Sequence, residues 1–126
     1  MPAKVLIADD DEKFRTLVET GLKGAYEVFC AADGQIGVQL ATKHQPQVIL
    51  VDVMMPHLAG IEMLRALQSD MDTRSIPCIV MSGSHANPAT QELFAQESNF
   101  FAFIAKPFQI PDLKVQIEAA LASAPK

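Results

Sequence analysis

Carboxylates, one hydroxyl and one amine follow short apolar runs at four places in this chain. They are Asp9, Asp10, Asp11 and Glu12 after the first run, and then Asp52, Ser82 and Lys106. Clustered carboxylates repel one another unless they share a cation, and oxygen ligands of this kind suit Mg²⁺, which binds alongside phosphate. A carboxylate near a divalent cation and a lysine is a competent phosphoryl acceptor, because both cations offset charge on the phosphoryl oxygens. These residue types therefore indicate metal-assisted phosphoryl chemistry.

The apolar runs that precede these residues are expected strands. They cover residues 5–8, 26–31, 48–51, 78–81 and 102–105. Short runs without clean polar alternation are typical of strands buried on both faces, as in a parallel sheet covered by helices.

Five helices are expected between and after these strands. The apolar positions that mark four of them are Phe14, Leu17, Val18 and Leu22; Ile36, Leu40 and Ala41; Ile61, Leu64 and Leu67; and Ile110, Leu113, Ile117, Ala120 and Leu121. A further helix with a thin apolar face is expected at about 88–96, and Asp11 and Asp33 are expected N-caps. The alternation predicts a (βα)5 doubly wound parallel sheet in a three-layer α/β/α sandwich. In such sheets the functional crevice lies at the carboxyl ends of the strands.

Each of these residues also has an ordinary structural explanation. Acids that open a helix are often only partners of the helix dipole, and Lys106-Pro107 alone is an ordinary turn. Asp52 has no helix to cap, because Met54, Met55 and Pro56 intervene before the next helix. Coincidence at four different strand ends is the weaker explanation, so we expect these side chains to share one crevice.

Composition limits the class of protein. The chain has 126 residues with 49% apolar and 20% charged residues, which fits one globular domain spanning 1–126 with a core at about 4–121. The net charge of −5 argues against direct nucleic-acid binding. No apolar run approaches the roughly 20 residues of a membrane span, and no signal peptide is evident. Cys30 and Cys78 lack metal-type spacing and fall in expected strands, so we expect both to be small core residues. We expect a cytoplasmic domain without membrane insertion and without an output domain in this chain.

Four segments in order carry a resemblance to a known family. They are Ala8-Asp9-Asp10, Asp52 to Pro56 with Gly60, Met81-Ser82-Gly83, and Lys106-Pro107-Phe108. Together they resemble the receiver domain of two-component response regulators, over essentially the whole chain. The resemblance implies a flavodoxin-like fold and a phosphorylation switch rather than an enzyme. Such a switch would take its phosphoryl group from a sensor histidine kinase or a phosphotransfer protein.

The resemblance also implies a role for each matched residue. Asp52 would be the phosphoacceptor. Asp10 and Asp52 would ligate Mg²⁺ (or Mn²⁺) directly with the backbone carbonyl of Met54, and Asp9 would act through a metal-bound water. Residues that would bind the phosphoryl group or act in the switch are Ser82, Gly83, Lys106 and Phe103. Residues that would shape the site are Pro56, Gly60 and Pro107, and the proline after the lysine is usually cis in this family.

The sequence departs from the family pattern in ways that bear on signalling. Phe103 stands where Tyr is often found, so switching would rest on packing alone, and Ser82 replaces the commoner Thr. The stretch 87–100 is unlike the family, which affects the shape of the fourth helix. Five of the seven Phe lie between Phe94 and Phe108. A downstream protein is therefore expected on the last two helices and last strand, a surface that also allows a homodimer.

Two alternatives remain open. A pseudo-receiver would keep the fold as an interaction module without phosphorylation. A haloacid-dehalogenase-like phosphatase would use Asp9 and Asp11, but Lys13 departs from its motif. A further hypothesis concerns lifetime: Met54 and Ser84 lack groups that orient an attacking water, so a phosphorylated state would be long-lived.

Overall fold

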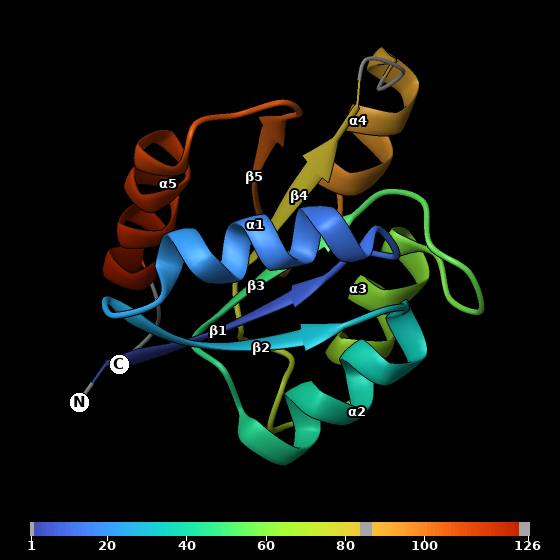
Figure 1. The fold of residues 1–126 in the computed structure, drawn as a ribbon. Helices are drawn as coiled ribbons and strands as arrows, with labels where there is room; N and C mark the ends of the chain where they lie inside the picture. The colour runs from blue at the N-terminus through green and yellow to red at the C-terminus, as the bar shows by residue number, and fades with distance from the viewer. Residues whose placement is uncertain (1, 84–86, 124–126) are drawn as a thin grey trace.

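Strands and helices alternate along the chain. The structure, a computed structural model, describes residues 2–83 and 87–123. The strands are β1 (Ala3–Ala8), β2 (Tyr26–Ala31), β3 (Val48–Asp52), β4 (Cys78–Ser82) and β5 (Phe100–Ala105). The helices are α1 (Glu12–Leu22), α2 (Gly34–His44), α3 (Gly60–Gln68), α4 (Pro88–Ala95) and α5 (Ile110–Ser123) (Figure 1). Every expected element is present.

The five strands form one parallel sheet in the order β2-β1-β3-β4-β5. This is the flavodoxin-like (βα)5 fold expected from the sequence. The register pairs Ala8 with Val51 and Asp52 with Met81, so the carboxyl ends of β1, β3 and β4 lie side by side. The polar residues that follow these strands are therefore delivered to one edge of the sheet.

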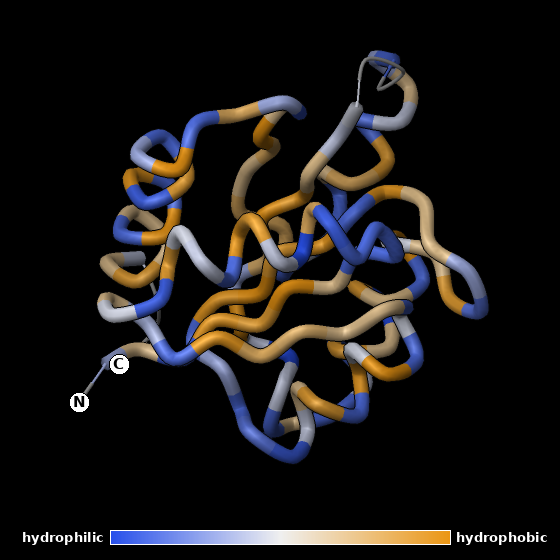
Figure 2. The backbone as a smooth tube through the Cα atoms, viewed as in Figure 1, coloured by the Kyte–Doolittle hydropathy of each residue, from blue (hydrophilic) through white to orange (hydrophobic). Residues whose placement is uncertain are grey.

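Alternate side chains of the central strands enter two separate hydrophobic cores. Leu6 and Ile49 belong to the core beneath α2, α3 and α4, whereas Ile7 and Leu50 belong to the core beneath α1 and α5. The strands in the middle of the molecule are accordingly the most hydrophobic part of the chain (Figure 2). Both faces of the sheet are covered, which explains the uninterrupted apolar runs.

Three helices begin at a side chain that caps backbone N–H groups. Asp11 accepts hydrogen bonds from the backbone of Lys13 and Phe14, and Asp33 accepts one from Ile36, as expected. Asn87 caps α4 in the same way, and α4 ends at Ala95, one residue before the expected boundary.

Two of the apolar positions that mark the expected helices lie on the surface. Leu17 in α1 is 59% exposed and Ile36 in α2 is 40% exposed. In α1 the fully buried positions are Val18 and Leu22, one turn apart, and the partly buried Phe14 packs against the same core. Cys78 is buried as expected, whereas Cys30 is only half-buried on the edge strand β2.

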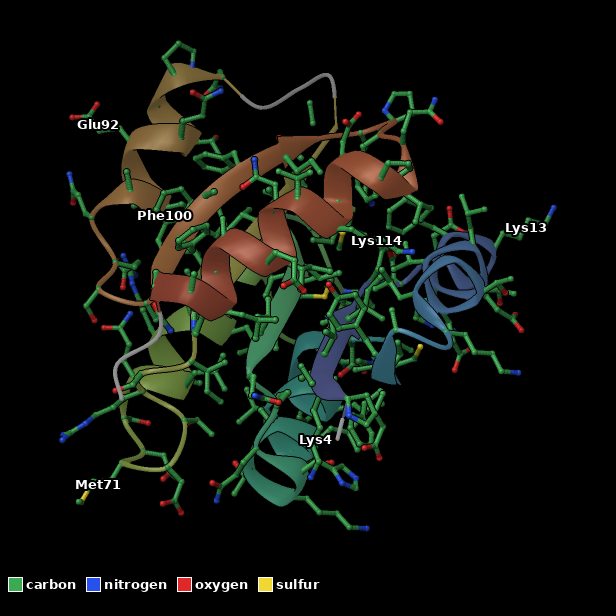
Figure 3. All side chains as sticks on the ribbon, turned by 90° about the vertical axis from the view of Figure 1, so that its left-hand side faces the viewer. Lys4, Lys13, Met71, Glu92, Phe100 and Lys114 are labelled. Carbon is green, nitrogen blue, oxygen red and sulfur yellow. The ribbon has the colours of Figure 1, made fainter. Side chains whose placement is uncertain are left out.

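A β-bulge in β5 decides how its phenylalanines are distributed. Phe100 pairs with Cys78 and Ala102 pairs with Ile79, so Phe101 is the extra residue. Phe100 and Phe103 consequently pack on the same core, with ring centroids 4.9 Å apart, although strict alternation would place them on opposite faces. Phe100 lies at the start of β5, beside the α4 layer (Figure 3). Among the five clustered phenylalanines only Phe94 is fully buried.

No helix within the described ranges is long and apolar enough to cross a membrane.

Candidate functional site

The polar residues after β1, β3 and β5 meet at the carboxyl edge of the sheet. Asp9, Asp10 and Asp52 each place a carboxylate oxygen within 4.8 Å of the others. Lys106 Nζ lies 2.6 Å from Asp9 Oδ2 and 3.4 Å from Asp52 Oδ1. The structure thus brings together three acids and the one lysine that the sequence placed at different strand ends.

Asp9 is the buried member of this cluster. Its Oδ1 accepts a hydrogen bond from the backbone N–H of Asp11 at 2.9 Å, and its Oδ2 accepts from Lys106. Arg15 donates to the Asp9 backbone carbonyl at 2.7 Å, which ties α1 to the end of β1. Both carboxylate oxygens of Asp9 already accept hydrogen bonds, an arrangement that suits an indirect role towards a metal. Asp10 is exposed at the rim.

Asp52 ends β3 and is partly buried. Its Oδ1 accepts a hydrogen bond from the backbone N–H of Val53 at 3.0 Å. Burial raises the pKa of the Asp52 carboxyl above its usual 3.8, and the charge of Asp9 raises it further, while Lys106 opposes both effects. Because the neighbouring negative charge is not fully balanced, a cation bound here would stabilise the ionised carboxylate.

Lys106 follows β5 and links three strands. Burial alone would lower the pKa of its ammonium group, but hydrogen bonds and charge from Asp9 and Asp52 outweigh burial and raise it. Its backbone N–H donates to the Ser82 carbonyl at 2.8 Å, and the Lys106-Pro107 peptide bond is cis. A charged ammonium is therefore held at the acidic cluster.

The loop between β3 and α3 is drawn close to the end of β3. The Gly60 N–H donates to the Val53 carbonyl at 3.1 Å. A Cβ on Gly60 would lie 2.5 Å from the Asp52 carbonyl oxygen, so only glycine allows this approach. In the same loop Met54 is 73% exposed whereas Met55 is buried, and the exposed Pro56 accepts a backbone hydrogen bond from Leu58.

A cavity of about 360 Å³ opens beside this cluster. It is lined by Asp52, Val53, Met54, Ser82, Gly83, Thr90 and Lys106. Ser82 is buried in its wall, and Thr90 comes from the first turn of α4. No sequence signal pointed to Thr90, because its place depends on how α4 packs against the sheet. Ser84 lies outside the described residues.

Phe103, the expected switch position, is half-buried and is not among the residues that line this cavity. Its ring packs edge-on against Phe94 of α4, with centroids 5.8 Å apart, and against Phe100. It therefore contacts the helix that also contributes Thr90 to the cavity.

An acidic cluster with a lysine at the carboxyl edge of a (βα)5 sheet agrees with the family comparison. Residues 5–118 match the model of the response regulator receiver domain, so the chain belongs to this family of two-component signalling domains. Phosphoryl acceptance is the general function of that family.

Individual relatives support the same assignment. The polar-differentiation response regulator DivK of Brucella anthropi is 31% identical over 98% of this chain and 100% of its own length. The chemotaxis protein CheY4 of Vibrio cholerae superposes with a TM-score of 0.88 at 29% identity, covering 96% of this chain and 100% of CheY4. A third similar structure is the receiver domain of the sensor histidine kinase PA1611 of Pseudomonas aeruginosa, which was solved with magnesium coordinated in its active-site cleft. It superposes with a TM-score of 0.87 at 25% identity, covering 98% of this chain and 100% of the PA1611 domain.

Other relatives are much longer than this chain. The chain spans 8% of Histidine kinase P4 of Formosa agariphila and 51% of the response regulator MprA of Mycolicibacterium vanbaalenii. Receiver domains thus occur among these relatives both as whole proteins and as parts of larger ones.

Proposed function

We propose that this domain is a phosphorylation-dependent switch that accepts a phosphoryl group on Asp52 and then changes its affinity for a protein partner. One observation carries the proposal: Asp52 lines a cavity, 3.4 Å from an ammonium group and within an acidic cluster. A carboxylate in such surroundings can act as a nucleophile while nearby positive charge balances the incoming phosphoryl oxygens.

The donor set fits a divalent cation. Asp10 and Asp52 would hold Mg²⁺ or Mn²⁺ directly together with the Met54 backbone carbonyl, and Asp9 would act through a water. When bound, the cation would offset negative charge on the phosphoryl oxygens. The family membership and the magnesium named for the PA1611 receiver domain support this choice of metal.

The transfer itself needs little from the protein beyond position and charge. An Asp52 carboxylate oxygen attacks phosphorus, the phosphorus–nitrogen bond of a donor phosphohistidine breaks, and the imidazole nitrogen leaves with the bonding electrons. Lys106 would pair with the transferred oxygens, and the Ser82 hydroxyl in the cavity wall would donate a hydrogen bond to one of them. Gly83 beside it leaves space, because a Cβ there would meet no described atom within 4 Å.

Signal output would then depend on the elements around Phe103. Movement of the Ser82 hydroxyl towards the phosphoryl group would change the packing of Phe103 against α4. This would shift a pre-existing equilibrium between two conformations of the surface formed by α4, β5 and α5. The donor would be a sensor histidine kinase or phosphotransfer protein, and the receiver of the signal a protein bound at that surface or a second copy of the domain. We propose that the switch acts in the cytoplasm. It would work by binding other proteins and not as an enzyme.

The direct test is phosphorylation of defined variants. With acetyl phosphate and Mg²⁺, intact mass should show one added phosphoryl group on the wild type and none on Asp52→Asn. The exposed Asp72→Asn is the matched control and should be modified like the wild type. Lys106→Ala should spare incorporation better than it spares the change in partner affinity. A phosphoryl group on the same segment of the Asp52→Asn variant would show that Asp52 is not the acceptor.

Related assays decide between the competing functions. A pseudo-receiver would show no change in mass or spectrum with acetyl phosphate or beryllofluoride. A phosphatase would instead release phosphate from small phosphomonoesters with turnover.

A further inference from the structure

The ammonium of Lys106 has an aromatic neighbour in addition to its two carboxylates. Nζ lies over the ring of Phe14, 4.2 Å from the ring centroid. An ammonium over an aromatic face is attracted by the negative charge of the ring face, and the attraction grows when water is partly excluded. Because the Lys106 side chain is only 22% exposed, the contact lies in a partly desolvated place.

The ring of Phe14 is held in place by its surroundings. Its backbone N–H donates to the Asp11 cap at 3.2 Å, and the next residue, Arg15, is bonded to the Asp9 carbonyl. Phe108 packs edge-on against the ring, with centroids 5.5 Å apart and an interplanar angle of 82°. The preceding residue Lys13 points outward from α1 (Figure 3). The first turns of α1 therefore present one aromatic face to the site.

Lysine needs such a constraint more than most side chains do. Its charge sits on a flexible four-carbon stem and is strongly hydrated, so a partly exposed lysine tends to turn towards water. Asp9 attracts the ammonium to the buried side of the cluster at 2.6 Å, whereas Asp52 is further away at 3.4 Å. A third, uncharged contact limits the positions open to Nζ without competing for its proton.

We propose that Phe14 is a positioning residue that keeps the Lys106 ammonium beside the Asp52 carboxylate, with Phe108 fixing the angle of its ring. Its effect on phosphoryl binding rests on the proposed function of Asp52, but its effect on the position of Lys106 does not. If Phe14 were only core filling, any apolar side chain of similar size would serve as well.

Proton chemical shifts test the position of Lys106 without any phosphoryl group. The methylene protons next to Nζ should be shifted upfield by the Phe14 ring current in the wild type. The shift should persist in Phe14→Tyr, which keeps the ring, and disappear in Phe14→Leu. Unshifted protons in the wild type, or a shift that survives in Phe14→Leu, would overturn the proposal.

Beryllofluoride binding in the presence of Mg²⁺ tests the consequence. Phe14→Leu should weaken the affinity about 2- to 5-fold, as expected for one cation–π contact, while Phe14→Tyr restores it. Leu17→Ala, on the exposed side of the same helix, is the matched control and should bind like the wild type. In a Lys106→Ala background, Phe14→Leu should have no further effect.

Each outcome of this comparison is decisive. Equal loss with and without Lys106 would mean that Phe14 acts through general stability, which would overturn the proposal. Failure of the wild type itself to bind beryllofluoride would contradict the proposed function of Asp52, and the chemical shifts would still decide the role of Phe14.

Discussion

Charge balance at the acidic cluster explains the properties of its members. Three carboxylates cluster here, Lys106 contacts two of them, and the Arg15 guanidinium donates to the Asp9 backbone carbonyl, so negative charge is in excess by one. Asp9 takes the closer contact with Lys106, and Asp52 is left with a raised pKa caused by burial first and by Asp9 second. In the absence of a cation, the ionised Asp52 carboxylate therefore lowers the free energy of unfolding.

Removal of the Asp52 charge should stabilise the metal-free protein. A pKa raised by folding means that the folded state favours the protonated form, so stability present below the usual pKa is lost as pH rises through the folded value. At neutral pH, Asp52→Asn should raise the free energy of unfolding by up to about 1 kcal/mol, with the difference shrinking in acid. Urea unfolding in a chelator measures this, and a variant less stable than the wild type would contradict it.

Tyr26 gives a second pH-dependent prediction. Its hydroxyl donates to Glu118, and burial, followed by the hydrogen bond and charge of Glu118, raises the pKa of Tyr26 to about 12. The chain has one tyrosine and no tryptophan, so phenolate absorbance reports this residue alone. Glu118→Gln should bring the midpoint down towards the ordinary value of about 10, whereas Glu27→Gln should not. Stability from this pair is present below the ordinary value and lost as pH rises through the raised one.

Close approach of backbone segments matters most at the scale of elements. The β3–α3 loop reaches the end of β3 only because Gly60 has no side chain, and the bulge in β5 sends Phe100 and Phe103 to one core. Both devices control what surrounds the cavity: the first positions the backbone near Asp52, and the second sets Phe103 against α4.

Gly60→Ala should therefore disturb the site as well as the fold. A methyl group 2.5 Å from the Asp52 carbonyl must displace the loop, and we expect a loss of about 1–3 kcal/mol in the free energy of unfolding. Gly83→Ala is the matched control, because a Cβ there meets no described atom within 4 Å. Chemical denaturation compares the stabilities of the two variants, and equal stabilities would show that the β3–α3 loop can accommodate a methyl group at Gly60.

In the molecule as a whole, the sheet lies between two cores and brings the candidate site residues together at one edge. Val5, Leu6 and Ile7 are fully buried, so the strands give a rigid base for the acids that follow them. A ligand that binds only this folded edge must stabilise the entire domain, because the unfolded chain scatters the acids.

Mg²⁺ should accordingly raise the stability of the domain in a saturable way. The gain should be on the order of 1–3 kcal/mol at metal concentrations well above the dissociation constant, and a chelator should reverse it. Asp10→Asn should lose most of this gain, while Asp72→Asn, exposed and far along the chain, should keep it. Thermal unfolding at increasing Mg²⁺ measures the effect, and a wild type indifferent to Mg²⁺ would argue against the donor set.

The sequence was most informative where local patterns and strand ends decide the outcome. The (βα)5 order, the caps at Asp11 and Asp33, and the burial of Cys78 all follow from spacing and side-chain chemistry. The same spacing marked α1 and α2 correctly but did not show that Leu17 and Ile36 would be exposed, because helical periodicity does not tell how wide a stripe of the helix the sheet covers.

Residue types and their positions were enough to predict the kind of chemistry: acids, a hydroxyl and a lysine follow buried strands, and a parallel sheet must bring them to one edge. Which of these groups pair with one another depends on how the helices and strands pack. Contacts of a few ångströms depend on helix packing, which explains why Lys106 lies closer to Asp9 than to Asp52, why Thr90 enters the cavity, and why Phe14 covers the ammonium. The succession of strands and helices along the chain is encoded in local residue patterns, whereas such distances arise only when distant segments pack together.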